Sequence, residues 1–135
     1  DGTTTNKPVK MVNATNVVAV AGGVDHSLVL KSDGTVWSCG DNFYGQLGNG
    51  TYTAVNTNYL VAVKMINGFA NLNFTVAAGA NHSLAIDDSG AVYAWGSNWR
   101  GQLGRGSSPG NTMVPGKVVG SSGYIEVEGG EDQDL

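Results

Sequence analysis

The chain has 135 residues, of which 41% are hydrophobic and 13% are charged, and its formal net charge is -4. This apolar content excludes a wholly disordered chain, and seven Lys and Arg residues are too few for the basic surface that direct nucleic-acid binding requires. No apolar run approaches the roughly 20 residues of a membrane helix, so we expect neither nucleic acid nor membrane as a direct partner. The 21 glycines exceed the usual share of about 7% and predict many tight turns.

Short β-strands are the first elements that the sequence predicts. Residues 16–21 (NVVAVA) and 34–40 (GTVWSCG) are rich in β-branched or aromatic residues, and residues 26–31 (HSLVLK) alternate. The Asp and Gly of segment 31–34 (KSDG) fit the turn of a hairpin between two of these strands. A fourth strand is predicted at residues 59–66 (YLVAVKMI), and no window shows a sustained helical period.

The second half of the chain repeats the first at a fixed offset of 56 residues, which is the separation of His26 and His82. The anchors in the first copy are Gly23, His26, Ser27, Leu28, Gly34, Val36, Gly40, Asn42 and the segment Gly45–Gly48 (GQLG). Such a period predicts a stack of structural repeats. We divide the chain into the end of a preceding repeat (1–15), two full repeats (16–71 and 72–123) and the truncated start of a third (124–135).

Strand segments such as VVAVA, TVWSC and AVYAW have no polar face, so neighbouring sheets must cover both of their sides. We therefore expect Val18, Val36, Val92 and Trp95 to be buried. Radial stacking of four-stranded antiparallel sheets as the blades of an all-β propeller meets this demand. A β-solenoid usually has shorter coils, and a β-sandwich needs polar alternation. Pro115 heads a fourth strand, where its missing N–H suits an edge strand or a strand start.

Residues 21–51 and 77–107 resemble the regulator of chromosome condensation repeat, through AGGVDHSLVLKSDGTVWSCGDNFYGQLGNGT and AAGANHSLAIDDSGAVYAWGSNWRGQLGRGS. The resemblance implies a β-propeller, typically of seven blades. Two blades alone leave open sheet edges, so the chain would be a fragment of a longer propeller or would complete a ring by self-assembly. Cys39 departs from the pattern because the second repeat has Trp95 there, with Trp37 beside it as a candidate substitute. Gln133 stands where the repeat has His.

Several other residues are predicted to be structural. His26 and His82 occupy equivalent places in different repeats, so we expect buried imidazoles bonded to backbone, too far apart to share a metal ion. The Gly-Gln-Leu-Gly loops lack the Lys and Thr of a phosphate-binding loop. The acidic segments Asp87–Asp88 and 131–134 lack the ligand spacing of a calcium loop. Cys39 is expected to be a small buried hydrophobe. We therefore predict no catalytic residue, no metal, no cofactor and no enzyme activity.

The residues that vary inside the anchored loop are the candidate partner-binding residues. Phe43 and Tyr44 in the first repeat, and Trp99 and Arg100 in the second, lie between a fixed Asn and a fixed Gly. Large aromatics and Arg in loops are typical of protein interfaces. The alternative is that they pack over the sheet edge as local lids. Because loops of successive blades share one face, we predict a non-catalytic module that binds another protein, of unknown identity, through that face.

Two other roles stay open from the sequence. One is a structural spacer or filament subunit. The other, implied by the resemblance, is a guanine-nucleotide exchange factor for a small GTPase, which would need basic surface that these two repeats lack. Low charge with abundant Thr, Asn and Gly predicts an extracellular or cell-surface protein, and the resemblance to secreted bacterial members with aromatic loops favours a bacterial source. A cytoplasmic location is the alternative.

Overall fold

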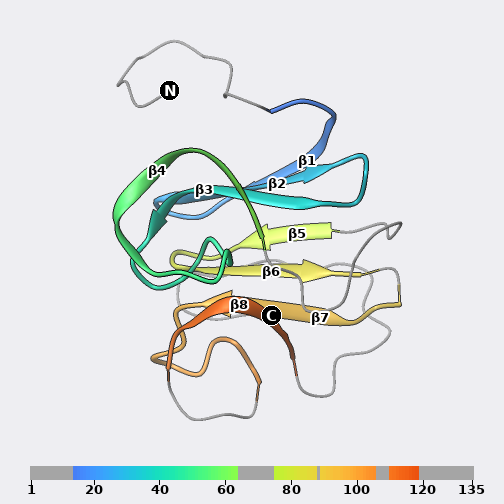
Figure 1. Cartoon of the computed structure of the whole chain (residues 1–135). Helices are drawn as coiled ribbons and strands as arrows, with labels where there is room; N and C mark the ends of the chain where they lie inside the picture. The colour runs from blue at the N-terminus through green and yellow to red at the C-terminus, as the bar shows by residue number, and fades with distance from the viewer. Residues whose placement is uncertain (1–13, 64–74, 88, 106–109, 119–135) are drawn as a thin grey trace.

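Eight β-strands arranged in two sheets are seen in the computed structural model, which describes residues 14–63, 75–87, 89–105 and 110–118. The first sheet has the strand order β1 (Val17–Gly22), β2 (His26–Lys31), β3 (Val36–Asn42) and β4 (Thr53–Ala62). The second has the order β5 (Thr75–Ala78), β6 (His82–Ile86), β7 (Val92–Gly96) and β8 (Thr112–Lys117). All neighbouring strands pair antiparallel, which confirms the predicted four-stranded antiparallel sheets (Figure 1).

The fourth strand of each sheet differs in detail from its prediction. Strand β4 begins at Thr53, earlier than the predicted residue 59, and residues 64–66 of the prediction lie outside the described residues. Pro115 lies inside β8 instead of at its start. The strand accommodates it because β8 is the edge of the second sheet, where a missing N–H breaks no ladder. The partial repeats at 1–15 and 124–135 lie outside the described residues, except for residues 14 and 15.

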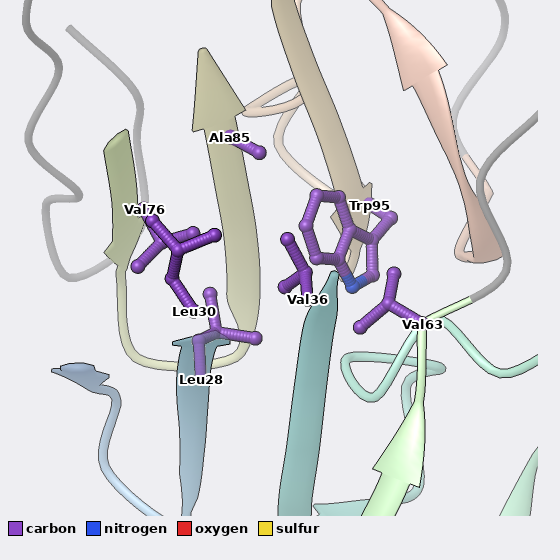
Figure 2. Packing of buried hydrophobic residues seen from close by; sticks show 7 residues of the cluster. All are labelled: Leu28, Leu30, Val36, Val63, Val76, Ala85 and Trp95. Atoms are coloured by element: carbon purple, nitrogen blue, oxygen red, sulfur yellow. The ribbon is translucent and has the colours of Figure 1, made fainter. Parts of the chain in front are cut away.

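The two sheets pack face to face around one hydrophobic cluster, which we call the seam (Figure 2). The first sheet and the residue after β4 contribute four aliphatic side chains, and the second sheet contributes three side chains that include the largest. In order they are Leu28, Leu30, Val36 and Val63, then Val76, Ala85 and Trp95. Burying each large aliphatic side chain contributes roughly 1.5 to 3 kcal/mol. Because Leu28 and Leu30 are two residues apart on β2, they project from the same face of the sheet.

The expectation that both faces are buried holds for the second sheet, although only its seam side has a neighbouring sheet among the described residues. Its other face forms a separate buried cluster that includes Leu84, Ile86 and Leu103. Val36, Val92 and Trp95 are all less than a tenth exposed, as predicted.

The same expectation is wrong for Val18, which is 60% exposed. Val20 is exposed as well, and it lies on the face opposite Ala19 and Ala21, which pack against the seam. The physical reason is that this side of β1 is turned away from the second sheet, and no other described sheet lies against it. One face of the first sheet is therefore still apolar and open.

Candidate functional site

The loop that follows the third strand of each sheet is built by its repeated asparagine. In the first sheet the Asn42 side-chain oxygen accepts a hydrogen bond from Leu47 N at 3.1 Å, and its amide group donates to Thr51 O at 2.8 Å. In the second sheet Asn98 accepts from Leu103 N at the same distance, 3.1 Å. Each Asn is buried. The fixed asparagines therefore stabilise the loop from inside by hydrogen bonds, and their side chains are not exposed to solvent.

Two β-turns lie at the tips of these loops. Gly45 N donates to Asn42 O at 3.2 Å, and Gly101 N donates to Asn98 O at 3.1 Å. Both glycines have a positive φ, of 82° and 72°, a conformation that glycine adopts without steric cost. The following glutamine closes each turn, because its side-chain oxygen accepts the N–H of Tyr44 or of Arg100, both at 2.9 Å.

The variable residues occupy the two corner positions of these turns. We call Phe43, Tyr44, Trp99 and Arg100 the corner residues. Phe43 is 61% and Trp99 66% exposed, Arg100 is exposed, and Tyr44 is half-buried. Phe43 and Tyr44 contact each other edge to face, with ring centroids 5.1 Å apart. The fixed residues build the turn through backbone and amide groups, and the exposed rings of Phe43 and Trp99 are not needed for it.

A polar chain crosses the seam beside the first loop. Ser83 Oγ donates to Gln46 O at 2.9 Å, and Trp95 Nε1 donates to the same carbonyl at 3.0 Å. His26 Nε2 lies 2.9 Å from Ser83 Oγ. Because the Ser83 hydroxyl hydrogen points at Gln46 O, the imidazole N–H must be the donor in this contact. The Gly-Gln-Leu-Gly segment therefore fastens the first sheet to the second.

His26 is buried at the start of β2 as predicted, but its contact is a serine of the other sheet. No pattern in the sequence points to this contact, because the two residues are 57 positions apart. Burial, reinforced by the nearby His82, lowers the pKa of His26 from 6.5 to about 4, and Asp41 and Asp25 oppose this shift. The imidazole is neutral at pH 7 and donates to Ser83, so it cannot accept that hydroxyl's proton as the base of a hydrolase would.

The glycine after the loop leucine explains how closely the seam packs. A Cβ at Gly48, whose φ is 65°, would lie 2.5 Å from Trp95 Nε1. Only glycine fits here, since both the conformation and the space exclude a side chain. Leu47 and Leu103 are completely buried.

Cys39 occupies the place in the first sheet that Trp95 holds in the second, because Cys39 pairs with Ser27 as Trp95 pairs with Ser83. Cys39 is half-buried, not fully buried as expected, and burial raises the pKa of its thiol. Trp37 does not replace the missing indole, since its N–H donates to Thr35 Oγ1 in its own hairpin at 2.8 Å.

Tyr52 is a surface residue that the sequence analysis missed. Its hydroxyl donates to Asn111 O of the second sheet's loop at 2.9 Å, although nearly half of the side chain is exposed. It lies outside the repeated anchors, so periodicity gave no signal for it. Its aromatic character directly after the loop was the available clue.

Metal and membrane signals were sought in the part of the chain that the structure describes. These residues contain no group of three or more His, Cys, Asp or Glu side chains placed to hold a metal ion. They also contain no helix with the length and apolar character needed to cross a membrane.

Sequence comparison links the chain to one repeat family. The family model described as the regulator of chromosome condensation (RCC1) repeat matches residues 33–86 and 89–133, and a second model of the same repeat matches 17–46 and 75–102. The RCC2 homologue of Danio rerio is 39% identical over 94 residues, covering 69% of this chain and 18% of that protein. Human HERC2, an E3 ubiquitin-protein ligase, is 36% identical over 112 residues, covering 80% of this chain and 2% of HERC2. The chain thus spans less than a fifth of these relatives.

Solved structures confirm the β-propeller class of the fold. Human WBSCR16 superposes with a TM-score of 0.72 at 30% identity, over 83% of this chain and 28% of that one. Yeast RCC1 (Prp20), solved with Kap60, gives a TM-score of 0.72 at 20% identity, over 86% of this chain and 28% of that one. At 20% identity, the likeness to yeast RCC1 shows only a shared fold.

The prediction of an extracellular or cell-surface protein is wrong. The relatives RCC2 and HERC2 are intracellular proteins. These relatives come from animals, and the similar structures come from human and yeast, so a bacterial source has no support either. The error arose because low charge and abundant Thr, Asn and Gly reflect the turn-rich repeat itself, whatever the compartment.

Proposed function

Because the chain belongs to the RCC1 repeat family, we propose that it is a non-catalytic protein-interaction module that binds its partner through the corner residues Phe43, Tyr44, Trp99 and Arg100. The observation that carries the proposal is that the fixed and the variable residues of the two loops have different roles. The fixed residues satisfy the turn's hydrogen bonds, and the side chains of Phe43 and Trp99 are more than half exposed on top of it. Exposure of this extent favours a contact surface over a local lid.

The turns also hold the corner residues in a defined position. A surface that is already ordered loses less conformational entropy when a partner binds, so affinity per contact is higher. Both loops follow the third strand of their sheet and lie at the same end of the molecule, on the left of Figure 1. One partner can therefore contact both pairs.

Two similar structures support a binding role in the family. Yeast RCC1 (Prp20) was solved bound to Kap60, and Prp20p has binding properties to Gsp1p and histones. The exchange-factor and spacer roles stay as alternative predictions. The spacer role differs in a measurable way, because it requires no partner contact at the corner residues.

A photo-crosslinking comparison would test the proposal. A photoreactive amino acid is placed at Phe43 or Trp99 and, as the control, at Ser32, which is exposed in the hairpin at the opposite end of the first sheet. We expect a specific cross-linked partner from the first two positions and not from the third. The Phe43→Ser/Trp99→Ser double variant should then lower affinity for that partner at least tenfold. An unchanged affinity would refute the proposal.

A further inference from the structure

The loop ends of the two sheets carry opposite charge. At the end of the first sheet, segments 23–25 and 41–53 contain two charged residues, Asp25 and Asp41. At the same end of the second sheet, the charged residues of segment 97–111 are both basic: Arg100 is exposed, and Arg105 is half-buried with its guanidinium group against Gly116. A partner that spans both loops therefore meets an acidic region beside a basic one.

The charge of Asp41 is not required for building its loop. Its carboxylate accepts a hydrogen bond from Gln46 Nε2 at 2.8 Å. In the second loop the equivalent contact is made by a neutral hydroxyl, since Gln102 Nε2 donates to Ser97 Oγ at 3.4 Å. The fold thus accepts a neutral residue at this position, and the first loop nevertheless carries a negative charge directly below the corner residue Phe43, whose N–H also points at Asp41, at 3.4 Å.

An apolar strip connects the two loops across the seam. Tyr52 and Met113 are both more than a third exposed. A Cβ at Gly45 would lie 2.8 Å from the Tyr52 ring and 2.9 Å from Met113 Cα, so the corner turn sits directly against both residues. Gly50 N donates to Met113 O at 2.8 Å, which fixes the strip to both sheets. The strip continues from Phe43 on the first sheet to the edge strand of the second.

We propose that this surface binds a polypeptide segment with basic side chains over the first loop, apolar side chains over the strip and acidic side chains over the second loop. The inference rests on the proposed function and names the chemistry of its partner. Opposite charges at the two ends fix the direction in which the segment lies, because the reversed orientation would place like charges together. An arginine over the first loop can also stack on the exposed aromatic ring of Phe43.

Four short synthetic peptides test the charge pattern on the full chain by fluorescence anisotropy. They share one apolar centre and carry Arg and Glu ends, two Arg ends, two Glu ends or two Gln ends. We expect the Arg/Glu peptide to bind tightest, with the differences shrinking at high salt because exposed charges are screened. Equal affinity for all four peptides, or binding of none, would overturn the inference.

Variants that remove one charge each show which loop binds which end of the peptide. Asp25→Asn and Asp41→Ser should weaken the Arg-bearing peptides about two- to fivefold, the range of exposed charge pairs, and should not weaken the Glu/Glu peptide, whose repulsion at the first loop they relieve. Arg100→Gln should weaken only the Glu-bearing peptides. Asp33→Asn is the matched control, since it removes the same charge at the opposite end of β2. If Asp25→Asn behaves like Asp33→Asn, the charge assignment is overturned, while Phe43→Ser still tests the proposed function independently with its natural partner.

Discussion

The two sheets are built from one repeated pattern, yet one face is buried in the second sheet and the equivalent face is open in the first. In the second sheet the face that carries Trp95 is covered by the first sheet, and Trp95 is fully buried. In the first sheet the equivalent face carries Cys39 and leaves Val20 70% exposed. The difference shows what a propeller strand requires. An apolar sheet becomes a core only where a neighbour supplies aliphatic side chains and a loop carbonyl for the indole.

The largest expected effect comes from making the second sheet like the first. Trp95→Cys removes the largest side chain of the seam and its hydrogen bond to Gln46 O. We expect a loss of about 4 kcal/mol in unfolding free energy, within the range of large-to-small core substitutions. Urea denaturation would measure it. Cys39→Ala, the matched control on the open face, should cost less than about 1 kcal/mol. Equal losses would contradict the contrast between the two faces.

Lowering the pH should reduce the stability of the folded chain, because His26 beside the seam becomes protonated. Its pKa in the folded chain, about 4, lies below the ordinary 6.5, so the unfolded chain binds more protons between these values. Stability is therefore complete above about pH 6.5, falls as the pH is lowered, and has lost roughly 3 kcal/mol below pH 4.

Denaturation midpoints measured from pH 7.5 to 4 would show this slope. His26→Gln should remove the slope in that window, because the other described groups with resolved shifts titrate outside it. The carboxyl pKa values of Asp33 and Asp87 are lowered from 3.8, and the pKa values of Cys39 and Tyr93 are raised from 9.0 and 10.0. A variant that retains the full slope would show that His26 is not its source.

A smaller effect distinguishes the glycines of the two loops. Gly48→Ala brings a Cβ to 2.5 Å from Trp95 Nε1 and strains a positive φ, so we expect a loss of about 2 to 3 kcal/mol. At Gly104 the φ is also positive, but a Cβ meets only Val118, at 3.2 Å. Gly104→Ala should cost about 1 kcal/mol, and thermal unfolding of both variants would measure the difference. If Gly104→Ala lowers the unfolding free energy more than Gly48→Ala does, the expected difference between the two loops is contradicted.

Much of the fold could be predicted from the sequence because the residues of each repeat determine its strands and turns locally. The strand residues are β-branched, and Asp-Gly or Ser-Gly turns separate them, so strand β2 begins and ends at the predicted residues. The corner residues were also visible, as the positions that change between fixed anchors. These features depend only on neighbours along the chain.

What the sequence did not reveal depends on how the sheets stack. His26 and Ser83 are 57 residues apart and meet only because the second sheet lies against the first. The exposure of Val18 has the same cause, since periodicity cannot tell which face finds a neighbour. Tyr52 was overlooked because it contacts the other sheet from outside the repeated anchors. Location was predicted wrongly because composition reports turns and strands and says little about the compartment.

The most direct measurement of the central claim is the unfolding free energy of the Phe43→Ser/Trp99→Ser variant. If the fixed residues alone build the loops and the corner residues serve a partner, stability should stay within about 0.5 kcal/mol of the unaltered chain, as for surface substitutions in general. A loss of about 2 kcal/mol or more would mean that the corner side chains are part of the core packing, and the account of the surface would be wrong.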